Sequence, residues 1–146
     1  MIIIKSSEEI ATMRQSGKIL AAILSRLEKE IRSGIKTCYL DEIMAEELKV
    51  RKVKSSFKGY QNFPANLCVS VNNEVVHGIP DKRVLKEGDI VSLDAGVIFE
   101  GFHSDSAITV GVGEITPQAK ELITGNSSAG YDSVLLNIGA VSIGDI

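Results

Sequence analysis

Two aspartates near the middle of the chain have the clearest chemical potential. Asp94 lies in a largely apolar run at residues 90–99, and Asp105 lies in a second run at residues 102–112, with a Glu-Gly dipeptide between the runs. Glycine readily adopts the positive φ that a tight hairpin turn requires. The two runs therefore predict an antiparallel hairpin with one aspartate on each strand.

The register of this hairpin decides whether the aspartates can act together. With the turn centred on the Glu-Gly dipeptide, Asp105 lies opposite Gly96 and Asp94 lies opposite Ala107. Alternate residues of a strand share a face, so the two carboxylates become diagonal neighbours, roughly 7 Å apart at the backbone. Two buried carboxylates this close repel unless one is protonated or a cation lies between them. A hard divalent cation suits such oxygen ligands, and hydrogen bonding of the aspartates to nearby backbone is the alternative.

Two histidines are further candidates. His77 precedes Gly-Ile-Pro in a loop and could be a metal ligand, an acid-base group or a surface imidazole. His103 stands two residues before Asp105, hence on the same face of the strand. It could support a metal ligand or lie at the rim of the site.

The amino-terminal part of the chain predicts two helices. Ser6 and Glu9 have the spacing of a capping box, and apolar residues then recur every three or four positions to about Ser33, with Gly34 as a natural helix end. A second helix is expected to start near Thr37. These helices must pack on the sheet that carries the aspartates.

The rest of the chain alternates strand and helix signals. We expect a half-buried strand at residues 67–71 and a short one at 75–76, both before the hairpin. A third helix should begin at Thr116-Pro117, be interrupted at residues 125–130 and resume at 131–137. The fold class is therefore α+β, an antiparallel β-sheet covered on one face by helices.

Composition favours one domain and no membrane segment. The chain has 146 residues, 44% hydrophobic and 24% charged, with a net charge of -3. The amino terminus lacks the pattern of a secretory signal, and no segment approaches the roughly 20 apolar residues that span a bilayer. We therefore expect a cytoplasmic protein in which Cys38 and Cys68 are free thiols.

Several separated motifs carry a family resemblance, which is collinear from about residue 6 to residue 122. The motifs occupy residues 57–60, 63–64, 68–80, 88–94 and 101–105. Together they resemble the type I methionine aminopeptidases, whose pita-bread fold consists of two helix-plus-hairpin halves. Residues 136–146 echo residues 30–43, as such a repeat requires. The resemblance implies one domain at 1–146, with a first repeat at about 6–113 and the truncated start of a second at about 116–146.

The resemblance also implies site residues and an activity. Asp94 and Asp105 match two of the five family metal ligands, which hold two divalent ions (Mn, Fe, Co or Zn). His77 would contact the scissile peptide group, while Tyr60, Phe63 and Cys68 would border the pocket for the methionine side chain. A metal-activated water would attack the carbonyl of the initiator methionine in a peptide or nascent chain.

Three family ligands would lie beyond the end of this chain, so we expect low metal occupancy and little turnover from it alone. One hypothesis is a methionine aminopeptidase that a complementary carboxy-terminal fragment completes. A second is a catalytically dead half-domain that binds peptides, dimerises or binds another partner, and ribosome association is a further expectation. A third is membership of the wider group that includes aminopeptidase P and creatinase. The motifs at 57–68 and 77–80 favour the methionine aminopeptidases.

Overall fold

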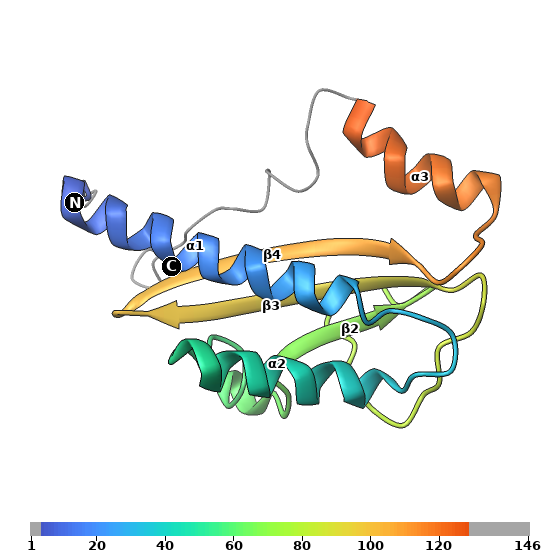
Figure 1. Cartoon of the computed structure of the whole chain (residues 1–146), viewed down its shortest axis with the longest axis horizontal. Coiled ribbons are helices and arrows are strands. Elements are labelled where there is room, and N and C mark those ends of the chain that lie inside the picture. Colours follow the sequence, from blue (N-terminus) through green and yellow to red (C-terminus); the bar gives the residue numbers. More distant parts are fainter. Residues whose placement is uncertain (1–3, 129–146) are drawn as a thin grey trace.

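Four antiparallel strands form one sheet, in which a single central strand pairs with the other three (Figure 1). The computed structural model describes residues 4–128. Strand β3 pairs with β4 along one side and with β2 and then β1 along the other. The elements in chain order are α1 Ser7–Glu28, α2 Thr37–Arg51, β1 Lys54–Ser55, a 3-10 turn Tyr60–Asn62, β2 Leu67–Val71, β3 Ile90–Phe99, β4 Phe102–Gly111 and α3 Pro117–Ser128.

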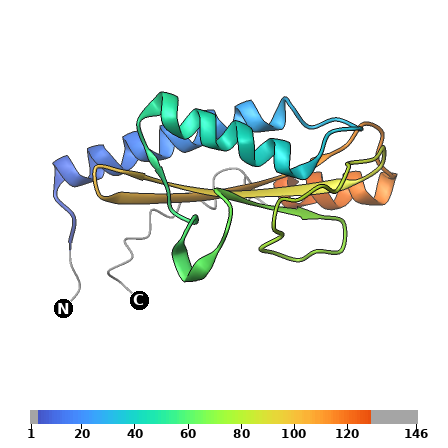
Figure 2. The same cartoon turned by 90° about the horizontal axis from the view of Figure 1, so that it is seen from below.

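Both long helices cover the same face of the sheet, which confirms the predicted layering (Figure 2). Strand β3 sends alternate residues into this helix layer, and Val91, Leu93, Ala95 and Val97 are all fully buried. They meet an apolar stripe from the two helices that includes Leu20, Leu27, Leu40 and Met44. Because strand side chains alternate, the residues between them point to the other face of the sheet. That other face carries Asp94.

The first helix starts as predicted but ends earlier. The Ser6 hydroxyl accepts the Glu9 amide at 3.2 Å, and the Glu9 carboxylate accepts the Ser6 amide at 2.7 Å, so the capping box forms. The helix ends at Glu28 rather than near Ser33. Gly34 has a φ of +91°, but its amide bonds the Leu85 carbonyl at 2.8 Å and belongs to a loop contact, not to the helix end.

The prediction of a half-buried β2 is wrong, because all five of its residues are buried. The segment at residues 72–81 folds against this strand. Within it, the Gly78 carbonyl accepts the Val69 amide at 2.9 Å, and the Gly78 amide donates to the Ser70 hydroxyl at 3.1 Å. The predicted strand at 75–76 is also wrong, since Val75 and Val76 lie in a loop and are 88% and 62% exposed.

The third helix begins as predicted, with the Thr116 hydroxyl accepting the Ala119 amide at 3.2 Å. The predicted break at residues 125–130 is wrong for its first part, because α3 continues to Ser128. The helix at 131–137 and the repeat at 136–146 lie outside the described residues. Among the helices described, none is long and apolar enough to cross a membrane.

Candidate metal site

The hairpin has the predicted register. Asp94 pairs with Ala107, and Gly96 pairs with Asp105. The turn residues Glu100 and Gly101 have φ values of +49° and +84°, so both adopt the left-handed conformation of a two-residue hairpin turn. The two aspartates are therefore diagonal neighbours on the sheet face that points away from α1 and α2.

The carboxylates are less buried than expected because their face is open. Asp94 is half-buried and Asp105 is exposed. Partial burial and the neighbouring Asp105 charge raise the pKa of Asp94 to about 6, while the charge of His77 acts in the opposite direction. Desolvation of the carboxyl group also raises the pKa of Asp105, although the residue as a whole is exposed. The pair thus resists carrying two negative charges, which a bound cation would relieve.

Cys68 lies in the same row of the sheet, directly opposite Asp94 on the adjacent strand. Its side chain is buried. Burial first, and then the charges of Asp94 and Asp105, raise the pKa of the Cys68 thiol to about 12. The thiol therefore stays neutral at physiological pH and acts as a weakly polar wall beside the carboxylates.

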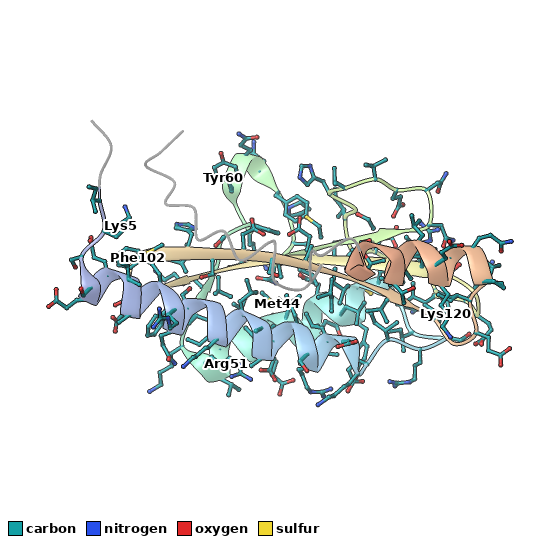
Figure 3. The ribbon with its side chains drawn as sticks, turned by 90° about the horizontal axis from the view of Figure 1, so that it is seen from above. Lys5, Met44, Arg51, Tyr60, Phe102 and Lys120 are labelled. Carbon is teal, nitrogen blue, oxygen red and sulfur yellow. The ribbon has the colours of Figure 1, made fainter. Side chains whose placement is uncertain are left out.

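An aromatic loop at residues 56–63 borders the same face. Tyr60 is 56% exposed and projects on the side of the sheet opposite Met44 (Figure 3). Phe63 meets Phe57 edge to face, with ring centroids 6.5 Å apart. A Cβ on Gly96 would lie only 2.9 Å from Phe57 Cε1, so the Phe57 ring lies against the sheet where a side chain is missing. The sequence did not predict Phe57 as a site residue. The absence of a side chain at Gly96, on the same face as Asp94, was the signal that an aromatic ring could lie there.

The two histidines occupy different positions around the carboxylates. His77 is exposed, has a φ of +59°, and lies close enough to Asp94 for its charge to affect that carboxyl group. His103 instead bonds the aromatic loop, with Nδ1 3.0 Å from the Ser56 hydroxyl. The structure therefore brings His77, Cys68 and both aspartates to one region, and it makes His103 a contact of the loop.

The donor set fits part of a divalent metal site. Within residues 4–128, no group of three or more His, Cys, Asp or Glu side chains is arranged to hold a metal ion. Two close carboxylates nevertheless supply hard oxygen ligands and a charge excess that a divalent cation neutralises. Further ligands would have to come from outside the described residues.

Comparison with known proteins identifies the family. The model for metallopeptidase family M24 matches residues 11–129, so the chain belongs to this family. It is similar to a methionine aminopeptidase of Clostridium perfringens, with 51% identity over 123 residues that make up 84% of this chain and 49% of the relative. A methionine aminopeptidase structure from Thermotoga maritima has a TM-score of 0.84 and 42% identity, covering 88% of this chain and 52% of that one.

These comparisons confirm the resemblance to methionine aminopeptidases and the expected half of a pita-bread fold. Aminopeptidase P of Escherichia coli, from the wider group, is less similar, with a TM-score of 0.69 and 26% identity over 80% of this chain. The chain spans about half the length of the curated relatives it matches.

Proposed function

We propose that this chain supplies the aspartate-bearing half of a metal-dependent aminopeptidase that removes amino-terminal methionine from peptides and nascent chains. One observation supports this proposal most strongly: Asp94 and Asp105 converge on an open sheet face and resist joint ionisation. Such a pair gains most from a divalent cation. Membership of a metallopeptidase family makes a metal the natural occupant.

The residues around the carboxylates have distinct proposed roles. Asp94 and Asp105 would hold the metal, which when bound would supply an activated water and neutralise developing charge. His77 would hydrogen-bond the scissile peptide group and orient it as charge develops. Tyr60, Phe63 and the neutral Cys68 would enclose the methionine side chain, whose flexible thioether packs well against aromatic and thiol groups.

The free edge of β4 supports completion of the site by a partner. Within residues 4–128, β4 pairs only with β3. A groove of about 870 Å³ is lined by consecutive residues 104–110 of β4, which belong alternately to the two faces of the sheet. Gly17 and Leu24 of α1 and Leu122 of α3 form its walls, and Asp105 lines it too. A segment that adds to this edge could bring ligands directly beside Asp105.

We therefore infer that residues 116–146 begin a second repeat, and that the remaining ligands come from a complementary carboxy-terminal fragment. The expected setting is the cytoplasm, where nascent chains present methionine. The test is methionine release from a Met-Ala-Ser peptide with Mn²⁺ or Co²⁺, using this chain alone and with the carboxy-terminal half of the Clostridium perfringens relative. We expect turnover only with the fragment, and its loss in Asp105→Asn.

The groove also favours a second candidate, an inactive half-domain that dimerises through the β4 edge. Exposed strand edges readily pair with another copy of the same edge. Sedimentation of the chain alone distinguishes the two candidates. A stable dimer that neither binds Mn²⁺ nor accepts the fragment would defeat the enzyme proposal for this chain.

A further inference from the structure

Hydrogen bonds at both ends shape the aromatic loop at residues 56–63, and one residue of the loop also bonds the carboxylate hairpin. The Ser55 hydroxyl accepts the amides of Phe57 and Lys58 at 3.0 and 3.1 Å, and the Gly59 amide donates to the Phe63 carbonyl at 2.9 Å. The Ser55 bonds also anchor the start of the loop, because Ser55 belongs to β1 and pairs with Val97 of β3. Within the loop itself, Ser56 makes the hydrogen bonds to the hairpin.

Ser56 reaches both strands that carry the aspartates. Its amide donates to the Gly96 carbonyl of β3 at 3.0 Å, and its hydroxyl lies 3.0 Å from Nδ1 of His103 on β4. Gly96 pairs with Asp105 across the hairpin, and His103 pairs with Ile98. The contact from His103 to Ser56 therefore spans β3 immediately beside the carboxylate pair.

We propose that His103 is a positioning residue for the methionine pocket. Through Ser56 it holds Phe57, and through the edge-to-face contact Phe63, at a fixed distance from Asp94 and Asp105. The missing side chain at Gly96 lets the ring lie against the sheet, and the His103 bond adds a side-chain anchor to the bond between the Ser56 amide and the Gly96 carbonyl. This inference rests on the proposed function, because it assumes that the loop receives the methionine side chain.

The chain offers a matched control for this bond. The Ser92 and Thr109 hydroxyls lie 2.9 Å apart on the same two strands and on the same face. Ser92→Ala therefore removes a side-chain hydrogen bond of similar length without touching the loop. His103→Asn is the conservative variant, because the Asn amide can occupy the position of Nδ1.

The experiment measures amide hydrogen exchange at residues 56–59 in the full chain, by NMR, for His103→Ala, Ser56→Ala, their double variant, His103→Asn and Ser92→Ala. We expect exchange about 5- to 10-fold faster in both single variants, the value for one lost hydrogen bond. Exchange in the double variant should be no faster than in either single variant. His103→Asn should restore the wild-type exchange rate, and Ser92→Ala should leave that rate unchanged. Unchanged exchange in His103→Ala, an additive double variant, or no rescue by His103→Asn would overturn the proposal.

Titration with L-methionine separates this inference from the proposed function. Where the chain binds methionine, affinity should fall by a similar factor in His103→Ala and recover in His103→Asn. A chain that binds no methionine contradicts the pocket assignment, while the exchange data still decide whether His103 positions the loop. Binding that is unaffected in His103→Ala would show that the loop position does not set methionine affinity.

Discussion

At the residue scale, the carboxylate pair follows from the period of a strand and one turn. Asp94 and Asp105 share a face because the Glu-Gly turn fixes the register, and a slip of one residue would separate them. The sequence therefore predicted which residues form the pair and that both lie on the same face of the sheet. Their exposure was not, because it depends on which sheet face the helices cover.

The raised pKa of Asp94 predicts an unusual pH dependence of stability in metal-free protein. An unfolded Asp ionises near pH 4, whereas Asp94 in the fold has a pKa of about 6. Between these values the folded chain binds more protons than the unfolded chain, so its free energy of unfolding should fall as pH rises. Asp94→Asn should remove much of that fall.

Urea denaturation in EDTA from about pH 4 to about pH 7, compared between the wild type and Asp94→Asn, measures this difference, because the range covers the window from about pH 4 to about pH 6. Mn²⁺ should restore the stability of the wild type at the upper end of the range. If the wild type instead gains stability relative to Asp94→Asn as pH rises, the pKa of Asp94 is not raised in the folded chain.

At the element scale, the helices and the hairpin followed from local patterns, but the two loops over the carboxylate face did not. Periodicity and capping predicted α1, α2 and the start of α3. The loop around Gly78 adds to the burial of β2, and Gly78 is nearly ten residues away from Val69 and bonds it only in the folded chain. Such long-range contacts leave no periodic signal.

The contact at Gly78 makes a substitution there costly. A Cβ would lie 2.2 Å from the Val69 carbonyl oxygen, which is a backbone atom and cannot move aside like a side chain. Gly78→Ala should lower the free energy of unfolding by about 1–3 kcal/mol and displace His77. Val75→Ala, at an exposed position of the same loop, should change it by less than about 0.5 kcal/mol. Equal stabilities of the two variants would contradict the close contact.

A carboxylate on α2 fixes the segment that leads into β2. Asp41 accepts the Asn66 amide at 2.6 Å and the Asn66 side chain at 3.2 Å. Asp41→Ala leaves a part-buried donor unpaired and should cost about 1–3 kcal/mol in thermal or urea unfolding. Glu42→Ala removes an exposed carboxylate from the next position and is the control. A loss as large in Glu42→Ala would indicate a general charge effect.

At the scale of the whole molecule, the groove along β4 links the fold to the need for further ligands. The sequence predicted incomplete ligation through the family resemblance, but it could not locate the groove, which arises from the packing of α1, β4 and α3. Seven consecutive β4 residues line it, so an added segment would meet both the strand edge and the carboxylate face.

Two neighbouring alanines of α1 test whether this groove receives the complementary fragment. Ala21 lines the groove and Ala22 does not, although both are exposed. Ala21→Arg should weaken fragment binding by about tenfold or more because it places a long charged side chain in an apolar wall. Ala22→Arg should bind as the wild type does. Titration calorimetry with the fragment gives both constants, and equal weakening would place the interface elsewhere.

The most direct test of the metal assignment is calorimetric titration of Mn²⁺ into metal-free chain at pH 7, a pH above the pKa of about 6 for Asp94. We predict weak, saturable binding to the wild type, its loss in both Asp94→Asn and Asp105→Asn, and no change in Glu121→Gln on α3. Binding that persists in both asparagine variants, or that Glu121→Gln abolishes, would contradict the assignment of the two aspartates as metal ligands.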